Sequence, residues 1–306
     1  MKKFLELIFF GNIFYGICAV IMTLESSLFQ GFVIDNMLFY VFIFCITILY
    51  YTQSYEIIFK LPKKNKAFKN NINKRLVWFR KNNKMIFYLQ IFLLIASIIS
   101  IVFYLYTIEN FFTNIRVIHI VLITVLLITA IFYYGKIMFP DKDISLRRGL
   151  IKPFIIGFVW AGVVVLMPAV MQEIIADKTV MSTLTLFSFL DYFLLVSILA
   201  IMFDIKDYED DINADLKTYI VQLGREKSIK KIIIPLIIIY ICFLIAMIIM
   251  IKQNIYFILY HTIVILLITS VVFSLFKDRK ILYYLIAIDG IMLIKAGLGI
   301  TVNLVN

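Results

Sequence analysis

Apolar runs of about 20 residues recur along the whole chain, and this feature decides the fold class. A run of that length is what an α-helix needs to cross roughly 30 Å of hydrocarbon. Inside lipid only helices and closed β-barrels satisfy their backbone hydrogen bonds, and barrel strands alternate polar and apolar residues. The run from Ile232 to Ile251 shows no such alternation. The sequence therefore predicts an all-α polytopic membrane bundle.

The apolar runs divide the chain into about nine predicted transmembrane helices. They cover Phe4–Thr23, Leu38–Ile58, Met85–Tyr106, Arg116–Tyr134, Pro153–Met171, Met181–Phe203, Ile232–Ile251, Tyr256–Phe276 and Ile281–Leu304. Composition agrees, because 63% of the 306 residues are hydrophobic and only 16% are charged. A soluble domain has about a quarter of its residues charged, so this class is excluded.

Basic residues predict the orientation of the chain in the membrane. If alternate connecting segments are taken as cytoplasmic, beginning with the amino terminus, these segments hold 26 of the 30 Lys and Arg residues. The opposite segments hold only Arg116, Lys178 and Lys252. The positive-inside rule then predicts a cytoplasmic amino terminus and an outside carboxyl terminus. The net charge of +11 therefore indicates topology and membrane lipid, with no nucleic-acid partner.

The chain is predicted to form a single transmembrane domain, since no Pro/Gly/Ser-rich linker divides it. The second and sixth predicted helices each end in a polar cluster, which is followed by basic residues and a further helix. This parallel suggests two four-helix repeats, about 1–135 and 150–276, plus a ninth helix. Frequent Ile, Lys, Asn and Phe suggest an A/T-rich bacterial genome, and hence a bacterial inner membrane.

The stretch that follows the sixth predicted helix is rich in acid. Asp204, Asp207, Asp211 and Asp215 would share one narrow face if this helix continued through the segment, at 100° per residue. Like charges three or four residues apart repel one another, so such a stripe faces bulk water or binds a cation. Carboxylates without His or Cys suit magnesium, which substrate phosphates commonly help to coordinate.

The residues from Asp204 to Gly224 resemble the second aspartate-rich motif of the UbiA superfamily of membrane prenyltransferases. The resemblance lies in Asp204, the D-x-x-x-D pair Asp207 and Asp211, the dipeptide Lys217-Thr218 and the dipeptide Leu223-Gly224. About nine helices, a cytoplasmic amino terminus and polar segments after helices two and six are also similar to that family.

This resemblance implies an enzyme that transfers a polyprenyl group from its diphosphate to a lipophilic, often aromatic, acceptor. It implies that Asp207 and Asp211 are catalytic carboxylates that hold Mg²⁺, with Asp204 as a supporting metal ligand. Lys217 would contact the diphosphate. Among the basic residues before the fifth predicted helix, Lys152 is nearest the membrane and is the candidate for substrate binding.

The first motif of the family, N-D-x-x-D-x-x-x-D, is missing where it should end the second helix. No aspartate occurs between Asp35 and Asp141, and the polar residues at that place include Gln53 and Glu56. These two are either oxygen donors to a metal and substrate, or a polar helix end beside aromatic interface anchors. The ten Lys and Arg residues between positions 60 and 84 either hold a diphosphate or serve as topology signal and lipid contact.

Two other functions remain open on the sequence alone. One is a non-catalytic relative of the family that binds an isoprenoid or another lipid. The other is a small-solute transporter, in which Asp191, Asp289 and Lys295 within the apolar helices would carry ions.

Overall fold

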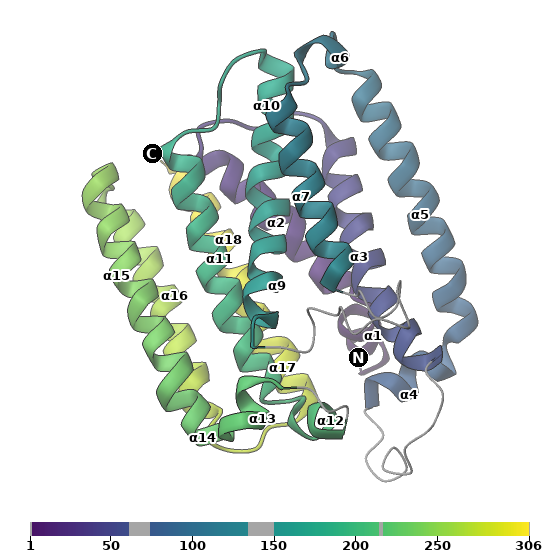
Figure 1. The fold of residues 1–306 in the computed structure, drawn as a ribbon, viewed down its shortest axis with the longest axis vertical. Coiled ribbons are helices and arrows are strands. Elements are labelled where there is room, and N and C mark those ends of the chain that lie inside the picture. The colour runs from purple at the N-terminus through teal and green to yellow at the C-terminus, as the bar shows by residue number, and fades with distance from the viewer. Residues whose placement is uncertain (1, 61–73, 134–149, 214–216, 306) are drawn as a thin grey trace. The chain divides into compact units, whose positions relative to one another are not determined.

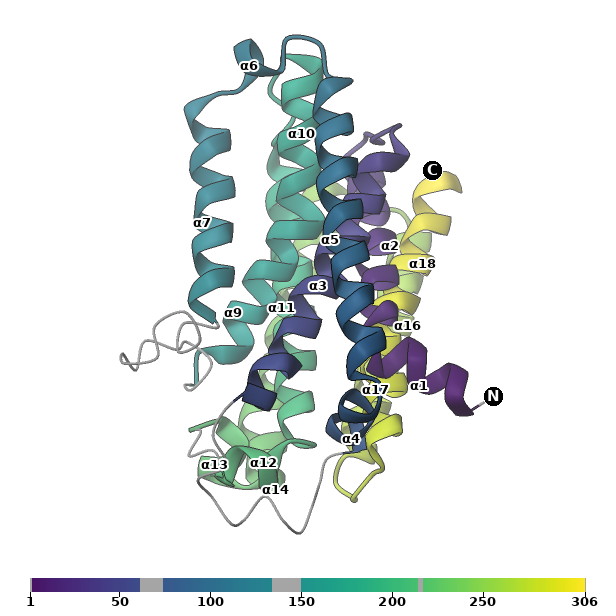
Figure 2. The same ribbon diagram turned by 90° about the vertical axis from the view of Figure 1, so that its right-hand side faces the viewer.

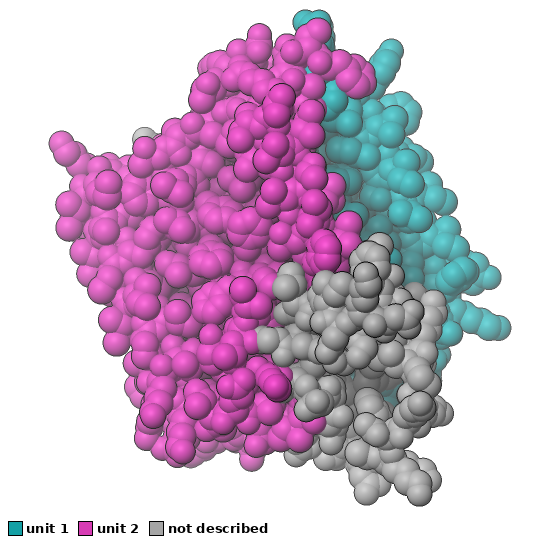
Figure 3. Space-filling model, in the orientation of Figure 1, with its two compact units in different colours: residues 1–20, 34–111 teal, residues 21–33, 112–306 magenta. Residues whose placement is uncertain are grey.

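The computed structural model describes residues 2–60, 74–133, 150–213 and 217–305 (Figure 1). Every regular element in these residues is helical, which confirms the predicted all-α class. The chain forms two compact units, residues 1–20 with 34–111 and residues 21–33 with 112–306 (Figure 3). Whether they belong to one domain with two repeats stays a prediction.

The described residues of the first unit form five helices, one of them in part. They are α1 (Lys2–Phe10), the first part of α2 (Ile13–Phe29), α3 (Met37–Lys60), α4 (Lys74–Lys81) and α5 (Asn83–Tyr106). Helices α3 and α5 pack together around the buried side chains of Cys45, Ile48 and Leu93. Most of the remaining large apolar side chains of α5 are exposed, as is typical of a helix that faces lipid.

The first predicted transmembrane helix, Phe4–Thr23, is wrong as an uninterrupted helix. Segments Phe4–Phe10 and Ile13–Phe29 meet at an angle of 61°, and Asn12 between them has a left-handed backbone with φ of 64°. The guanidinium of Arg75, only 2% exposed, donates to the carbonyls of Phe9 and Phe10. This buried cation therefore stabilises the carbonyl end of α1 at the break.

The chain continues through α6 (Phe111–Asn114) into the second unit. This unit contains the second part of α2 and the helices α7 (Val117–Tyr133), α9 (Lys152–Ala161), α10 (Met167–Ala176), α11 (Thr183–Asp204), α12 (Tyr208–Asn213), α13 (Tyr219–Leu223), α14 (Arg225–Ser228), α15 (Ile234–Ile251), α16 (Ile255–Ser274), α17 (Ile281–Ala287) and α18 (Asp289–Val305). Helix α11 packs against both α9 and α15, and α16 packs against α18. The short helices α12, α13 and α14 gather beyond the end of α11 (Figures 1 and 2).

Two transmembrane helices of this unit contain a π-helical turn just before a proline. Gly162–Leu166 joins α9 to α10 ahead of Pro168, and Ile229–Ile233 joins α14 to α15 ahead of Pro235. Proline has no N–H, and its ring clashes with the carbonyl four residues earlier. Widening the preceding turn relieves that clash without ending the helix.

A buried histidine and glutamate tie α7 to α10. His119 Nε2 lies 2.8 Å from Glu173 Oε2, and Glu173 Oε1 accepts from the backbone N–H groups of Val180 and Met181. The backbone N–H of Arg116 donates to His119 Nδ1, so the proton of the neutral ring is on Nε2. His119 is therefore a structural residue.

Six of the described helices are long and apolar enough to cross a membrane, and the bent pair of α1 and α2 makes seven. Two shorter apolar helices, Met37–Gln53 and Val117–Tyr133, occupy the ranges of two further predicted spans. The count of nine is therefore not confirmed, although the chain is an integral membrane protein with multiple apolar helices.

Candidate functional site

The close approach of α9 to α11 positions the first pair of candidate residues. A Cβ atom at Gly157 would stand 2.2 Å from Ser197 Oγ and 2.6 Å from the carbonyl oxygen of Phe193. Only glycine therefore permits the helices to pack this closely, as small residues do between membrane helices. The contact brings the first residue of α9, Lys152, to the last residue of α11, Asp204.

Lys152 and Asp204 form a buried ion pair between Lys152 Nζ and Asp204 Oδ1. Their side chains are 11% and 2% exposed. Removing either partner of such a pair would leave an uncompensated buried charge, which is strongly destabilising. The second oxygen, Asp204 Oδ2, has no hydrogen-bond partner among the residues that the structure describes.

The acidic stripe is broken rather than continuous. Helix α11 ends at Asp204, a turn follows at 205–207, and α12 begins at Tyr208. The predicted shared face required an unbroken helix, so that arrangement is wrong for this segment. Carboxylates at the carbonyl end of a helix meet the negative end of its dipole, and this gives a physical reason for the helix to stop there. Asp215 lies outside the described residues.

Asp207 and Asp211 have different surroundings. Asp207, in the turn, forms an ion pair with Lys206 at 2.7 Å, and its side chain is 30% exposed. Asp211, on α12, is buried, and its Oδ2 has no hydrogen-bond partner in the part of the chain that is described. Burial raises the pKa of Asp211 to about 7. The charge of Lys152 acts to lower this pKa, and the charges of Asp204 and Asp207 act to raise it. A nearby cation would therefore stabilise the ionised form of Asp211.

Thr218, at the start of α13, lies beside Asp211, and sequence reasoning did not assign it a role. Thr218 is buried, caps the start of α13 and hydrogen-bonds to Asp211. The signal available in the sequence was its position directly before the apolar run of α13. Lys217 beside it is exposed, so it is accessible to a ligand from water. Gly224, with φ of 78°, ends α13 in a conformation that favours glycine.

The two candidates from the missing first motif lie on a helix of the first unit. Gln53 is exposed on α3, and Glu56 follows it one turn later on the same helix. The side chain of Glu56 is outside what the structure describes. Their participation in a site with the three aspartates stays a prediction.

The second unit offers an oxygen-only donor set for a metal ion. Asp204 Oδ2 and Asp211 Oδ2 are buried oxygens without a hydrogen-bond partner in the described residues, and Asp207 is partly exposed nearby in sequence. No three His, Cys, Asp or Glu side chains of the described chain come together as a metal site. Mg²⁺ is commonly bound by only one or two carboxylates and completed by water and phosphate, and this is the donor chemistry that Asp204 and Asp211 offer.

Two solved structures share the fold. The apo structure of a UbiA homologue from Aeropyrum pernix K1 matches with a TM-score of 0.64 at 13% identity, over 95% of this chain and 98% of that one. A structure reported for a digeranylgeranylglyceryl phosphate synthase in membranes matches with a TM-score of 0.53 at 16% identity, over 100% of this chain and 98% of that one. Identities this low show the fold alone.

Comparison with curated proteins by sequence gives no match. A family model does match, that of the UbiA prenyltransferase family, over residues 87–281. These residues include Lys152 and the complete segment from Asp204 to Gly224, on which the resemblance to this family was based. Because the match spans more than half of the sequence, the chain belongs to the UbiA prenyltransferase family.

Proposed function

We propose that this protein transfers a polyprenyl group from its diphosphate to a lipophilic or aromatic acceptor within the membrane. The observation that carries the proposal is the buried Asp211 carboxylate, which has an oxygen without a hydrogen-bond partner in the described residues. It lies near enough to the Lys152–Asp204 ion pair to interact electrostatically with both residues. A buried acid of this kind is stabilised when a cation binds, and prenyl diphosphates enter enzymes of this family with magnesium.

In the proposed site, Asp207 and Asp211 hold Mg²⁺ and Asp204 supports them. The ion would neutralise charge on the departing diphosphate, which is the general role of a Lewis-acid metal in such a reaction. Lys152 pairs with Asp204 Oδ1 and fixes the direction of its carboxylate. Lys217, exposed at the start of α13, contacts the diphosphate from the aqueous side.

The proposed location is a bacterial inner membrane, with the amino terminus in the cytoplasm. Basic residues near the site support this orientation through the positive-inside rule. Gln53 and Glu56 are proposed to take the place of the missing first motif at the donor diphosphate.

Diphosphate release from farnesyl or geranylgeranyl diphosphate by the purified protein, with and without Mg²⁺, tests the proposal. We expect magnesium-dependent release that falls at least about 100-fold in Asp207→Asn and in Asp211→Asn, because a metal ion contributes several kcal/mol to such a step. Asp177→Asn is the matched control. Asp177 is an exposed acid with a left-handed backbone that asparagine also adopts, so release should be unchanged.

A second candidate, a relative that binds an isoprenoid diphosphate without cleaving it, rests on the absence of aspartate between Asp35 and Asp141. The same preparation separates the two functions. Equilibrium binding of geranylgeranyl diphosphate without release, across a panel of lipophilic acceptors, would support the binding protein and contradict the enzyme.

A further inference from the structure

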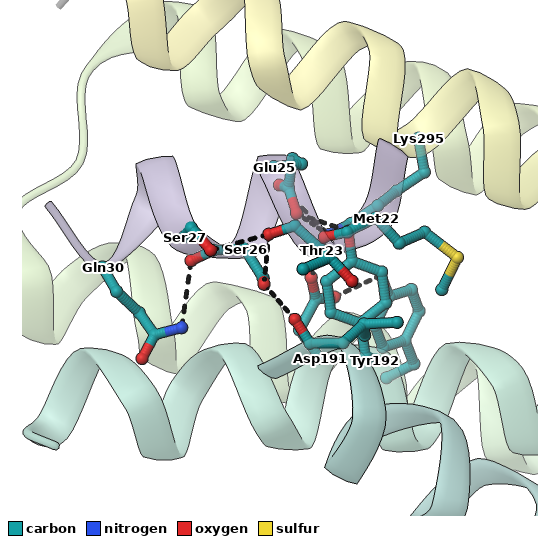
Figure 4. A network of polar contacts seen from close by, with 11 residues as sticks. Met22, Thr23, Glu25, Ser26, Ser27, Gln30, Asp191, Tyr192 and Lys295 are labelled. Carbon is teal, nitrogen blue, oxygen red and sulfur yellow. Dashed lines mark hydrogen bonds and ion pairs between the residues drawn. The ribbon is translucent and has the colours of Figure 1, made fainter. Parts of the chain in front are cut away.

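A second group of charged residues is buried in the helices of the second unit, apart from the diphosphate site. This buried triad consists of Glu25 on α2, Asp191 on α11 and Lys295 on α18 (Figure 4). Each residue is at most 4% exposed. Asp191 precedes Asp204 by 13 residues on the same helix, which separates the triad from the diphosphate site by about 20 Å along the helix axis.

Lys295 is the centre of the triad. Its Nζ lies 3.2 Å and 3.1 Å from the two oxygens of Glu25 and 2.9 Å from Asp191 Oδ2. The same ammonium lies 3.6 Å from the centroid of the Tyr192 ring. In the transporter alternative, the sequence analysis gave Asp191, Asp289 and Lys295 the role of carrying ions, and it did not recognise Glu25 as a partner of Asp191 and Lys295.

Polar side chains from neighbouring helices complete the surroundings of the triad. The hydroxyl of Tyr192, on α11, donates to Glu25 Oε2. The hydroxyl of Tyr240, on α15, donates to Asp191 Oδ1 at 2.6 Å. From α16, Tyr260 and His261 lie near enough to interact electrostatically with Asp191. Every helix that faces the triad therefore contributes a titratable group.

The formal charges of the triad do not balance. Two carboxylates face one ammonium, so the group carries a net charge of −1 if both acids are ionised and His261 is neutral. An uncompensated charge among membrane helices is costly. The gap beside Glu25, Asp191 and Lys295 does not admit a water molecule. A compensating cation that keeps a coordinated water therefore has no room without repacking of the helices.

Hydrogen-bond geometry selects Glu25 as the proton carrier. The Tyr192 hydroxyl has a second acceptor, the carbonyl oxygen of Met22, at 3.5 Å. If this hydroxyl turns to Met22, its oxygen can accept a hydrogen bond from a protonated Glu25. The hydroxyl of Tyr240, by contrast, has no acceptor other than Asp191 Oδ1 among the described residues, so it cannot turn away to accept from a protonated Asp191 without losing its own acceptor.

His261 is a poorer carrier of the proton. Both of its ring nitrogens lack a hydrogen-bond partner among the described residues, and the ring packs against Phe257 and Tyr260. An imidazolium would bury two N–H donors that carry charge and have no acceptor. The neutral ring avoids that cost.

We propose that the buried triad is a proton-binding site, with one exchangeable proton held on Glu25. On binding, the proton bonds to Glu25 Oε2, the Tyr192 hydroxyl turns from Glu25 to the carbonyl of Met22, and the charge of the triad changes from −1 to zero. Release reverses these changes and returns the proton to water. The site does not depend on the prenyl-transfer activity.

Infrared spectroscopy of the purified protein in micelles tests the proposal through the carbonyl stretch of protonated carboxyl groups. The measurement is made at pH 7 in an Asp211→Asn background, because Asp211 also binds a proton near this pH. We expect a Glu25 band of one group per chain, which Glu25→Gln abolishes. Asp191→Asn should abolish it as well, because Glu25 must then ionise to balance Lys295.

Two control variants and a thermal measurement complete the test. His261→Gln should leave the band in place, and Tyr192→Phe should shift its frequency without removing it. Glu25→Gln should have a thermal midpoint at least equal to that of the parent at pH 7, because glutamine reproduces a neutral acid. Persistence of the band in Glu25→Gln or in Asp191→Asn would overturn the proposal. The proposal would also be overturned if the band were absent and the thermal midpoint rose with Na⁺. That result would indicate a site for a metal cation.

Discussion

Replacement of Lys152 by methionine separates the energetic role of the Lys152–Asp204 pair from the rest of the site. Methionine keeps most of the length and volume of the lysine stem but removes the ammonium. Asp204 is 2% exposed, so water does not replace the lost partner. The carboxylate must then stay charged without compensation or take up a proton.

Protonation of Asp204 limits the loss of stability in Lys152→Met. Breaking a buried ion pair by removing one partner costs about 3–5 kcal/mol. Protonation of an acid with an ordinary aqueous pKa of about 3.9 costs about 4 kcal/mol at pH 7 but only about 1.5 kcal/mol at pH 5. We therefore expect Lys152→Met to lower the free energy of unfolding by about 3–4 kcal/mol at pH 7, and by less than half of that at pH 5.

Reversible unfolding in mixed micelles, followed by tryptophan fluorescence at the two pH values, measures this difference. The double variant Lys152→Met with Asp204→Asn should recover most of the loss, because no charge is left buried. Lys230→Met is the matched control. Its ion pair with Glu226 is exposed, at 59% and 68%, and should have no measurable effect. Equal losses at pH 5 and pH 7, or a double variant as unstable as Lys152→Met, would refute this account.

Three further predictions follow from the second unit. Mg²⁺ affinity should rise about tenfold between pH 6 and pH 8, because Asp211 with a pKa of about 7 must lose its proton to bind the ion. Calorimetry in two buffers measures the affinity and the released proton. Asp211→Asn should abolish the pH dependence. Gly157→Ala should lower the free energy of unfolding by about 1–3 kcal/mol, because it overpacks α9 against α11. Adding Ser197→Ala should raise the thermal midpoint of this variant, since it removes Ser197 Oγ from the contact. An unchanged midpoint would contradict that contact. Gly224→Ala should cost about 1–3 kcal/mol through backbone strain alone, because φ of 78° with ψ of 164° is a backbone region that only glycine adopts readily, and a Cβ there meets nothing within 4 Å. Chemical unfolding of this variant measures the cost, and an unchanged free energy of unfolding would contradict the φ angle.

Sequence reasoning succeeded where a local pattern is strong. Long apolar runs predicted an all-helical membrane protein, and the residues from Asp204 to Gly224 were sufficient to identify the UbiA family. Lys152 was singled out for its position at a membrane boundary, and the structure pairs it with Asp204. These features depend on residues close together in the chain, or on one charge at a helix end.

The failures involve partners that are distant in sequence. The break at Asn12 had a local signal, the dipeptide Gly11-Asn12, but it depends on Arg75 more than 60 residues later. The end of α11 at Asp204 has no Gly or Pro to announce it, because the segment that follows is Ile205-Lys206-Asp207. Glu25 was overlooked because its partner Lys295 is 270 residues away in the sequence.

The π-helical turn at Gly162–Leu166 has a consequence for helical register. A π-helical turn accommodates one residue more than an α-helical turn of similar height, so the residues after it are rotated by about 100° relative to an uninterrupted α-helix. Glu173 contacts His119 in the register that follows this turn. Deletion of a single residue from this turn would therefore change which side of α10 faces α7, although every side chain of α10 is retained.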